Sequence, residues 1–447
     1  MGSSKKGNGI FTALGAATGL GNALRFPSLC YTYGGAFVFA YTVSLLLICF
    51  PLLCAELSIG KRYALSYDKA LKTLSPKLSW VAYSAAINSA IIALYYSVIS
   101  AKLGGAFLGF ATLNEARDLS GFTLFISGGI SLLAVWFILR GKNNRMARTG
   151  VLSVVGSLSL LCILAVTVLI KGGSIVKVFT FNIADMASGG LWADALGQSL
   201  LALSLAGGVM PTFARSFNGD FSVTKTAAKI IAANLTGCLL SATATLSLPV
   251  AVPEGSGVTI ALTIYPQVLS SAFSNAVVRR IFGTSVFAAL WLVALQSACS
   301  LFSPVIGLAD EEKRNAAVTG LCLLSLILLP VFGARECAAM RAVDRMACSV
   351  SAVLIAFVQC IAFSAKRNIA VLNSDGGSYL GILIKYLCPV ACGALALFSL
   401  CGARFSLFPP YAVVCAFAVP VCAFAPAAVH TACNRAKIIS KLRRQKS

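Results

Sequence analysis

The sequence predicts an all-α membrane protein with about twelve transmembrane helices, each built from the ~20 apolar residues that span a bilayer core. Of its 447 residues, 58% are hydrophobic and only 11% are Asp, Glu, Lys or Arg, whereas a soluble domain has about 25% of these charged residues. The mean hydropathy is +0.87. Long apolar runs recur from one end of the chain to the other, and they set the expected order of the helices.

The expected helices follow these apolar runs. They lie near residues 9–33, 36–60, 78–107, 122–140, 149–171, 191–217, 225–251, 284–308, 315–333, 344–365, 379–402 and 408–432. Because the first run contains Asn22 and Arg25 and has no small-residue cleavage site, we do not expect a removable signal peptide. The prediction is one transmembrane domain over residues 9–432, between tails at residues 1–8 and 433–447.

The net charge of +22 comes from basic residues that are unevenly placed. If the N-terminus is inside, the inside-facing connections hold most of them, at Lys61, Arg62, residues 140–148, Arg215, Lys225, Lys229, Lys366, Arg367 and residues 435–446. The positive-inside rule then places both termini in the cytoplasm. Short loops and the chain length suggest a multi-pass protein of a bacterial inner membrane. A basic tail on anionic lipid explains the charge, so we expect no nucleic-acid partner.

Enzyme chemistry and zinc-type metal sites lack candidate residues. The 16 cysteines lie scattered in apolar runs without paired C-x-x-C units, and His430 is the only histidine. Ligation by Cys and His therefore cannot be assembled. No nucleophile–base pair, phosphate loop or dinucleotide fingerprint occurs, so we predict that the protein is not an enzyme.

The first apolar run is interrupted. Three glycines between residues 15 and 21 are followed by Asn22, Arg25 and Pro27. Broken backbone at membrane depth is tolerated only where it is buried in protein or lines a water-filled cavity. The freed carbonyls and half-helix ends are ready ligands for an ion or a zwitterion. We therefore expect a binding site built from backbone.

The sixth apolar run is interrupted in a similar way. Residues 197–208 (GQSLLALSLAGG) carry small residues at the centre of the run, and Pro211 follows them. Paired interruptions at corresponding positions of two halves indicate a transporter site between inverted repeats. The alternative is that the small residues only allow close helix packing. The pairing favours a five-plus-five inverted repeat in which helices 1 and 6 are broken.

Glu56 is the one acidic residue that lies clearly within an apolar run. A carboxylate inside a membrane is a functional hypothesis by default. Because Glu56 lies near the cytoplasmic end of its run, we favour a structural role. In that role, the carboxylate accepts a hydrogen bond from the freed backbone of a neighbouring broken helix.

In several motifs the chain resembles the neurotransmitter:sodium symporter family, and in particular its amino acid transporters of the bacterial leucine-transporter type. The motifs are residues 19–27 (GLGNALRFP), 34–37 (GGAF), 51–60 (PLLCAELSIG), 257–266 (GVTIALTIYP), 294–304 and 343–346. The match covers most of the chain and is strongest in the first two helices.

The resemblance implies a substrate site between the two broken helices. Its residues would be Ala17, Leu20, Gly21, Ile92, Tyr96, Leu201, Ala202, Ser204, Gly207, Ser297 and Leu301. The amides of Leu20 and Gly21 and the hydroxyl of Tyr96 would bind a carboxylate. The carbonyls of residues 17, 201 and 202 and the hydroxyl of Ser204 would face an ammonium group. We expect Tyr95 to form an aromatic pair in a helix interface.

The resemblance also restricts the substrate. Relatives that transport monoamines carry an acidic residue where this chain has Gly19, so a free amino acid with its own carboxylate is favoured. The expected lining, which includes Ala298, is apolar and would make a charged substrate side chain costly to bury. Where relatives often place aromatic rings, the chain has Leu201 and Gly207, which would leave room for a sizeable apolar or aromatic side chain.

Two sodium sites are implied, with altered ligands. The first would use Ala17, Asn22, Ala202 and Asn234, and the second Gly15, Thr18, Val293, Gln296 and Ser297. Relatives carry Ser or Thr at the position of Ala202, and usually a hydroxyl or carboxylate at that of Gln296. Cys238 stands where chloride-dependent relatives carry Ser, so chloride dependence is unsupported.

The gates of the family are matched in part. Arg25 and Asp344 match the outer-gate ion pair, which would close over the substrate. Glu311 matches the acidic partner of the inner gate, and Lys5 or Lys6 would be its basic partner.

The implied function is secondary transport of a neutral amino acid into the cell, coupled to sodium, by alternating access in a lipid bilayer. Two alternatives stay open. One is a sodium-independent transporter of the same fold, and the other is an amino acid sensor that does not transport. The oligomeric state is not predicted.

Overall fold

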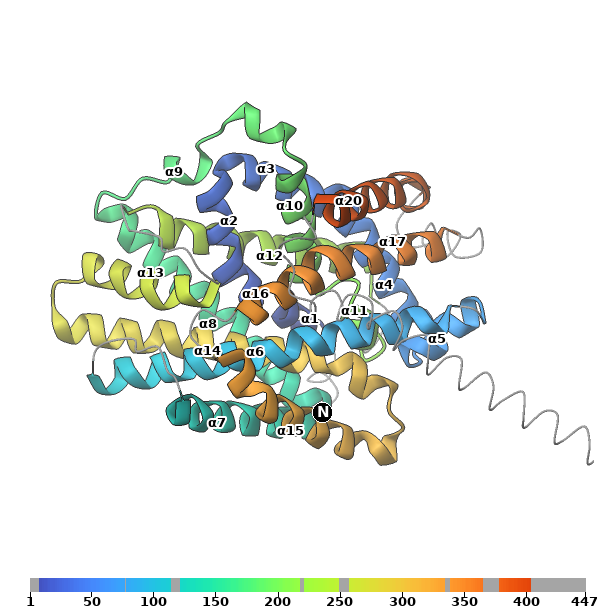
Figure 1. Cartoon of the computed structure of the whole chain (residues 1–447), viewed down its shortest axis with the longest axis horizontal. Helices are drawn as coiled ribbons and strands as arrows, with labels where there is room; N and C mark the ends of the chain where they lie inside the picture. Colours follow the sequence, from blue (N-terminus) through green and yellow to red (C-terminus); the bar gives the residue numbers. More distant parts are fainter. Residues whose placement is uncertain are drawn as a thin grey trace, which may run out of the picture.

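The computed structural model describes residues 8–76, 78–113, 121–217, 221–248, 257–333, 338–364 and 378–402. Within these ranges every regular element is a helix and no strand occurs, so the predicted all-α class is confirmed. Figure 1 shows a bundle in which most helices run along the long axis of the molecule. The predictions for Lys5, Lys6, His430 and the run at 408–432 lie outside the described residues.

The first half of the chain contains α1 (Asn8–Ala17), η1 (Gly21–Arg25), α2 (Phe26–Tyr33), α3 (Gly35–Ser44), η2 (Leu45–Cys49), α4 (Phe50–Tyr63), α5 (Tyr67–Leu74), α6 (Ser79–Leu113), α7 (Gly121–Arg140), α8 (Lys142–Ile170), α9 (Val176–Phe179) and η3 (Ile183–Ala187). The second half contains α10 (Gly189–Ala202), α11 (Val209–Ala214), α12 (Val223–Leu246), α13 (Gly257–Ala272), α14 (Ala276–Leu308), η4 (Glu311–Lys313), α15 (Arg314–Gly333), α16 (Ala338–Arg345), η5 (Met346–Ser351), α17 (Ala352–Phe363), α19 (Ser378–Ile382), η6 (Leu383–Leu387) and α20 (Cys388–Gly402).

Each apolar run that falls within the described residues contains helix at the expected place. The clearest difference is at residues 284–308, where α14 begins earlier, at Ala276. The side chain of Asn275 accepts the amides of Val277 and Val278 at 2.9 and 3.3 Å. An Asn that accepts such amides is a favoured helix cap, so it sets the start of α14 ahead of the apolar run.

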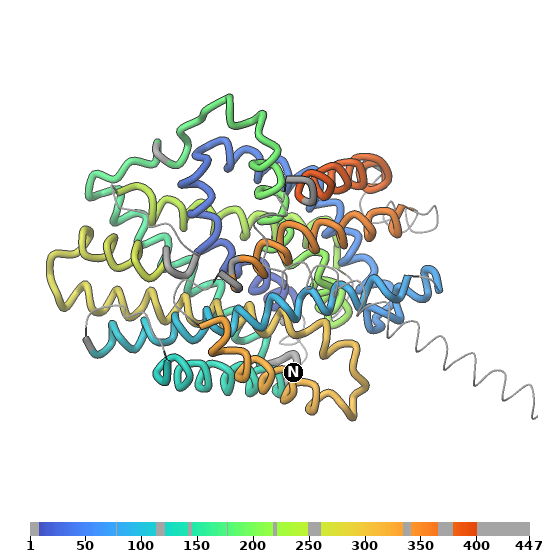
Figure 2. Tube along the Cα trace, viewed as in Figure 1, coloured from blue at the N-terminus to red at the C-terminus, as the bar shows by residue number. Residues whose placement is uncertain are grey.

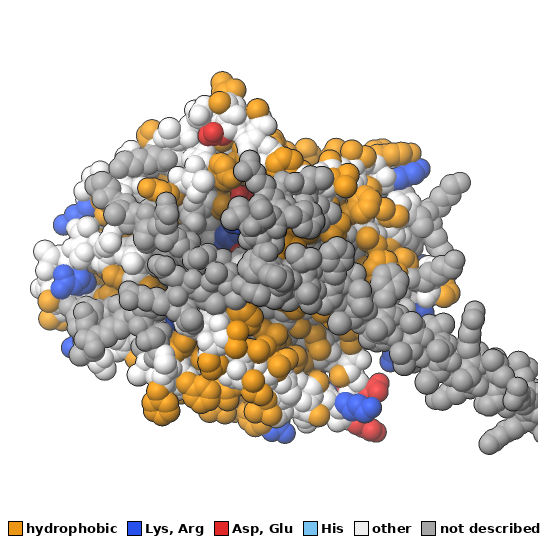
Figure 3. All heavy atoms as spheres, in the orientation of Figure 1, with side chains coloured by type: hydrophobic (Ala, Val, Ile, Leu, Met, Phe, Trp, Pro, Cys, Tyr) orange, Lys and Arg blue, Asp and Glu red, His pale blue; other side chains and the backbone are white. Residues whose placement is uncertain are grey.

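The helices α6 and α14 pack against each other and form the interior of the bundle. In each of them, 78% of the most apolar stretch is buried, against 28% for the stretch that contains α15. Figure 3 shows hydrophobic side chains gathered over α7 and α15 at the lower side of the molecule. Phe122 and Leu133 of α7 and Ile327 of α15 are among the most exposed. Such a large exposed apolar surface marks contact with lipid or protein.

Nine helical stretches among the described residues are long and apolar enough to cross a membrane. Neither interrupted run is among them, because each is divided into shorter helices. The first interruption separates α1 from η1, and the second separates α10 from α11. The broken spans contact each other through α1 with α11 and η1 with α10. Figure 2 traces the first of them, in dark blue, through the middle of the bundle.

Candidate functional site

The break in helix 1 frees carbonyls, and polar side chains from other helices reach them. The Ala17 carbonyl accepts Nδ2 of Asn22 at 3.2 Å and Nδ2 of Asn234 at 2.7 Å. The Gly21 carbonyl accepts Nε2 of Gln198 at 3.0 Å. Buried carbonyls need such partners to be stable. The break is therefore stabilised by side chains of α10 and α12.

Glu56 of α4 contacts the break in helix 6. This fully buried side chain accepts the amide of Ala206 through Oε1 at 3.1 Å. In a continuous helix the same amide would bond to the carbonyl of Ala202, four residues earlier. Glu56 therefore releases that carbonyl from its helical partner. The contact is the structural role that we favoured for this carboxylate.

The backbone between α10 and α11 is strained. Ser204, Ala206 and Gly208 have φ values of 52°, 59° and 73°. Positive φ is uncommon for residues with a side chain, because Cβ then crowds the backbone. Among the described residues, the one other non-glycine case is Ala64. Strained conformations of this kind persist where the surrounding structure enforces them, and they cluster at functional sites.

Three of the four residues predicted for the first sodium site, Ala17, Asn22 and Asn234, bond to one another. Nδ2 of Asn234 is 3.2 Å from Oδ1 of Asn22, in addition to its bond with Ala17. The hydroxyl of Tyr41 donates to Oδ1 of Asn234 at 2.6 Å and so holds the other end of that carboxamide. Carbonyl and amide oxygens at the ends of half-helices are the ligands that transporters use for sodium. In this structure the Ala17 carbonyl and both carboxamide oxygens accept N–H or O–H groups, so a cation would have to replace these hydrogen bonds.

The residues predicted for the second sodium site come from two elements. They are Gly15 and Thr18 at the first break, and Val293, Gln296 and Ser297 on one stretch of α14. The hydroxyl of Ser297 accepts the amide of Leu20 at 3.3 Å, which ties α14 to the break. Among the described residues, no main-chain amide donates to the carbonyls of Gly15 or Thr18. These carbonyls and hydroxyls also fit sodium.

Polar groups predicted to meet the substrate lie around the same breaks. The side chain of Tyr96 is 6% exposed, and its hydroxyl bonds to no described residue. The amide of Gly21 likewise donates to no described main-chain carbonyl. Ser204 donates to the carbonyl of Ala16 at 3.4 Å, and its amide bonds to the Leu201 carbonyl at 3.0 Å. The free groups are therefore the Gly21 amide on helix 1, the Tyr96 hydroxyl on α6 and the Ala202 carbonyl on helix 6, whereas the Leu201 carbonyl, predicted to face an ammonium group, already accepts the Ser204 amide.

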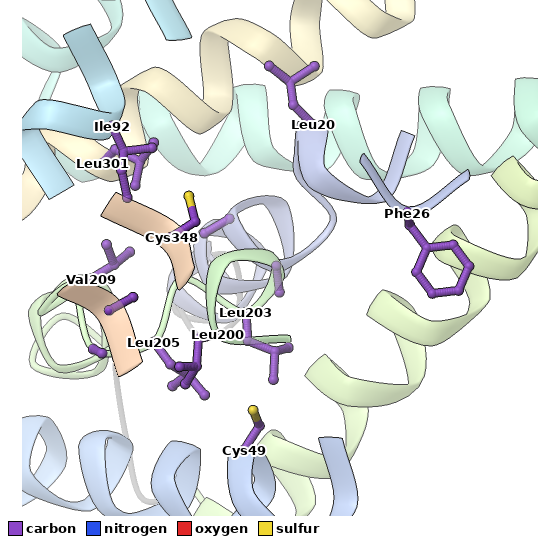
Figure 4. Packing of buried hydrophobic residues seen from close by; sticks show 14 of the residues in the cluster. Leu20, Phe26, Cys49, Ile92, Leu200, Leu203, Leu205, Val209, Leu301 and Cys348 are labelled. Carbon is purple, nitrogen blue, oxygen red and sulfur yellow. The ribbon is translucent and has the colours of Figure 1, made fainter. Parts of the chain in front are cut away.

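The apolar residues of the predicted site come mainly from α6 and α14. Ile92 and Leu301 are buried, and Figure 4 shows their side chains close to each other on these packed helices. The expected room beside Gly207 is filled. A Cβ on Gly207 would lie 2.2 Å from Oγ of Ser89, which also donates to the Gly207 carbonyl at 2.9 Å. The position of Gly207 therefore provides no room for a substrate side chain. Of the two positions on helix 6 where we expected such room, only that of Leu201 remains.

The two side chains of the predicted outer gate do not bond directly in this structure. Arg25 donates to the hydroxyl of Ser349 at 3.3 Å. Asp344 accepts the hydroxyl of Tyr95 at 2.6 Å, so Tyr95 is more than an aromatic neighbour of Tyr96. At the inner gate, Glu311 begins η4, and its predicted basic partners lie outside the described residues.

Several supporting residues are absent from the sequence-based prediction. Tyr41 and Gln198 bond to the first break or its ligands, and Thr149 of α8 donates to Oε1 of Gln296 at 2.8 Å. Their one signal in the sequence is a polar side chain within an apolar run. That signal is shared by many Ser and Thr residues that bond only to their own helix.

Comparison with known proteins finds relatives that are described as sodium-dependent transporters. The model of the sodium:neurotransmitter symporter family matches residues 3–111. An uncharacterized sodium-dependent transporter of Methanocaldococcus jannaschii is 27% identical over 364 residues, which cover 72% of this chain and 73% of that protein.

Two mammalian relatives match over a shorter stretch. The sodium- and chloride-dependent transporter XTRP3A of Mus musculus is 40% identical over 93 residues, or 21% of this chain and 16% of that protein. The sodium-dependent neutral amino acid transporter B(0)AT3 of Rattus norvegicus is 40% identical over 91 residues, or 20% of this chain and 15% of that protein. The matched stretches are therefore small parts of both relatives.

The fold has a solved counterpart. The crystal structure of MhsT in complex with L-phenylalanine matches with a TM-score of 0.79 at 18% identity, over 89% of this chain and 99% of that chain. The family model and these relatives describe sodium-dependent transporters. The predicted resemblance is confirmed: the chain is similar to the sodium:neurotransmitter symporter family over residues 3–111 and to a sodium-dependent transporter over most of its length, and it has the fold of MhsT.

Proposed function

We propose that this protein imports a neutral amino acid together with sodium by alternating access. It would do so as a multi-pass protein of the inner membrane with both termini in the cytoplasm. The observation that carries the proposal is the meeting of two broken helices with free main-chain donors and acceptors. A zwitterion needs both, since its carboxylate accepts N–H groups at a helix N-terminus and its ammonium donates to carbonyls.

Gly19 supports an amino acid rather than a simple amine. A Cβ on Gly19 would lie 2.8 Å from Oγ of Ser297. The acidic side chain of monoamine-transporting relatives would therefore displace Ser297, which already bonds to the amide of Leu20. Without a carboxylate in the site, the substrate brings its own. We assign the hydroxyl of Tyr96 and the amide of Gly21 as donors to it.

The side chain of the substrate is apolar in this proposal. Ile92, Ala298 and Leu301 are buried and carry no polar group that could satisfy a charge. Large neutral amino acids are the first candidates, because the related fold of MhsT is seen with L-phenylalanine. The B(0)AT3 relative is likewise described as a neutral amino acid transporter.

Sodium coupling is supported by the oxygen ligands at both predicted ion positions. Ala202 supplies only its carbonyl, so the first position has one oxygen fewer than in relatives with Ser or Thr there. The carbonyl freed by Glu56 remains, and Asn22 and Asn234 bring carboxamide oxygens that would exchange their present hydrogen bonds for the ion.

Uptake into proteoliposomes tests the proposal. We expect a large neutral amino acid to accumulate under an inward sodium gradient and not under potassium. Equal accumulation in both salts would favour the sodium-independent alternative. Binding without accumulation would favour the sensor. Thermal melting with each amino acid, in sodium and in potassium chloride, identifies the substrate beforehand.

Tyr96→Phe removes the proposed hydroxyl donor to the carboxylate. A hydrogen bond to a charged group contributes about 1.5–3 kcal/mol, so we expect the substrate affinity to fall by about 10-fold or more. Tyr31→Phe is the matched control, because Tyr31 is exposed on α2. Titration of melting temperature with the amino acid measures both variants. Equal affinities for the two would remove Tyr96 from the site.

A further inference from the structure

Arg215 is a partly buried basic residue that the predicted gates do not include. It follows α11 directly, and its Nη2 lies 3.7 Å from the position that a Cβ on Gly307 would take. Gly307 lies in the last turn of α14, four residues before Glu311, the first residue of η4. The guanidinium of Arg215 therefore lies against the end of α14, next to the acidic residue of the predicted inner gate.

Three charged side chains act on Arg215 from the elements around it. Glu311 of η4 and Asp68 of α5 attract its charge, and Arg314 at the start of α15 repels it. Arg314 is held in place, because its Nη2 donates to the Leu139 carbonyl at 3.1 Å. The attraction thus joins α11 to η4 and α5, and a fixed like charge weakens it. Such a link holds two elements together and can still be broken.

Asp68 has an oxygen that is available to Arg215. Its Oδ2 accepts the hydroxyl of Tyr83 of α6 at 3.5 Å, whereas its Oδ1 is buried and has no partner among the described residues. A buried carboxylate oxygen without a donor is unfavourable. A guanidinium carries five N–H groups, so one arginine can donate to two carboxylates. Arg215 is therefore suited to hold Asp68 and Glu311 together.

Phe217, two residues after Arg215, contacts the start of α1. A Cβ on Gly9 would lie 2.6 Å from Cδ1 of Phe217, so the ring lies directly against the backbone of α1. The ring also packs against that of Phe221, with 5.0 Å between the ring centroids. The segment after α11 thus contacts α1 through Phe217 and the end of α14 through Arg215.

These contacts lie across one route away from the predicted substrate site. The site is at the two breaks, and α1 and α11 are the half-helices that connect the breaks to this end of the molecule. The two half-helices contact each other, and both contact α14. A substrate that leaves the breaks toward this end must pass between these half-helices and α14. A link between α11 and the end of α14 therefore closes the route.

We propose that Arg215 is the basic residue of the inner gate, and that it closes the route to the cytoplasm by linking α11 to Glu311 and Asp68. The inference rests on the alternating access proposed above. It replaces our expectation that Lys5 or Lys6 supplies this charge, because the basic residue comes from helix 6 itself. Movement of α11 away from α14 then separates the charges directly, without any change in the N-terminal tail.

The test measures whether this route is open in the purified full-length protein without amino acid. Thr212 of α11 is 9% exposed, and a Cβ on Gly307 would lie 3.4 Å from its Cγ2. Thr212→Cys therefore places a thiol in the interface between α11 and α14. Its rate of reaction with a charged, water-soluble methanethiosulfonate is measured, and the protein without this substitution gives the background from the native cysteines.

In the Thr212→Cys protein we expect slow labelling, because the interface is closed most of the time. Adding Arg215→Ala should raise the rate about 2- to 5-fold, as expected for the loss of a partly exposed ion pair. Arg215→Glu should raise the rate further, because it brings three carboxylates together. Combining it with Glu311→Arg should lower the rate again, which a general loss of structure would not do.

Two controls separate the gate from other effects. Arg148→Ala removes a basic residue that is exposed on α8, and it should leave the labelling rate unchanged. Lys5→Ala combined with Lys6→Ala tests the tail directly, and it should also leave the rate unchanged. The melting temperature of each variant reports any general loss of stability.

Two results would overturn the inference. Both Arg215 variants could be labelled at the rate of the Arg148→Ala control, or the tail variant could be labelled faster than either of them. Either result, with a wild type that accumulates amino acid in proteoliposomes, rejects the role of Arg215 and leaves the proposed transport in place. A wild type that accumulates no amino acid rejects both.

Discussion

The two broken helices are stabilised in opposite ways. In helix 1 the groups bonded by side chains are mainly carbonyls, with the Leu20 amide as an exception, and donors reach these carbonyls from several elements. Gln198 bonds to one carbonyl, and Ser241 and Tyr265 both bond to the Ala23 carbonyl at 3.2 Å. In helix 6 a freed group is the amide of Ala206, and one acceptor, Glu56, binds it.

The backbone differs in the same sense. None of the described residues between Ala17 and Phe26 has a positive φ, whereas three residues between Ala202 and Val209 do. Support for helix 1 is distributed and its backbone is relaxed. Helix 6 is supported by Glu56 at the Ala206 amide and by Ser89 at the Gly207 carbonyl, and its backbone is strained. We infer that helix 6 is the more easily disturbed of the two.

Glu56→Leu should have the largest effect, and it tests whether helix 6 is the more easily disturbed of the two. Leucine cannot accept a hydrogen bond, so the buried amide of Ala206 would lose its partner at a cost of about 1–3 kcal/mol. The amide could then bond to the Ala202 carbonyl again and close the break. We expect a lower melting temperature and no stabilisation by the amino acid substrate. Thermal melting with and without substrate measures both effects.

Glu56→Gln separates the hydrogen bond from the charge. The carboxamide keeps an oxygen for Ala206, so this variant should retain most substrate binding. Glu312→Gln is the control, because Glu312 is exposed. A Glu56→Leu protein that melts and binds as the control does would show that helix 6 does not depend on this carboxylate.

A double-mutant cycle on Ser241 and Tyr265 tests whether the support of helix 1 is distributed over several donors. Each donates to the Ala23 carbonyl, and their hydroxyl oxygens are 3.3 Å apart. After Ser241→Ala or Tyr265→Phe, one donor remains, so we expect each to cost less than about 1 kcal/mol. The double variant leaves the carbonyl unpaired. It should cost more than the sum by about 0.5–3 kcal/mol, as contacting residues do.

Equilibrium stability of the four proteins measures the cycle. If the stability losses of the two single variants add up to that of the double variant, neither donor compensates for the loss of the other. Helix 1 would then be no better supported than helix 6. The Phe variant keeps the ring that packs edge-on against Phe287, so the cycle reports the hydroxyl groups alone.

The sequence predicted the places of both breaks, because clusters of glycine and other small residues weaken a helix where they interrupt an apolar run. It also predicted the role of Glu56, because a membrane carboxylate requires a donor. It did not predict Thr149 or Gln198, whose partners lie on helices far away in the chain. Nor did it predict that Ser89 fills the space at Gly207, because packing between α6 and the second break depends on helix positions.

Ala206→Gly gives the smallest expected effect and tests the strain directly. Ala206 and Ala195 are both fully buried, but only Ala206 has a positive φ. Replacing alanine by glycine in a helix costs about 1 kcal/mol, and the buried methyl group lost in either variant costs about 0.8 kcal/mol. At Ala206, removing Cβ also relieves the unfavourable left-handed backbone conformation, which stabilises the variant by about 1–2 kcal/mol.

We therefore expect Ala206→Gly to be close to wild type in stability, and Ala195→Gly to be clearly less stable, in the same melting assay. Ala64→Gly completes the set. Ala64 has a positive φ of 50° on the exposed end of α4, so this variant gains the relief without losing a buried methyl group, and it should be more stable than wild type. If Ala206→Gly loses as much stability as Ala195→Gly, the backbone at the second break is not strained. Glu56 would then stabilise helix 6 only through its hydrogen bond to the Ala206 amide.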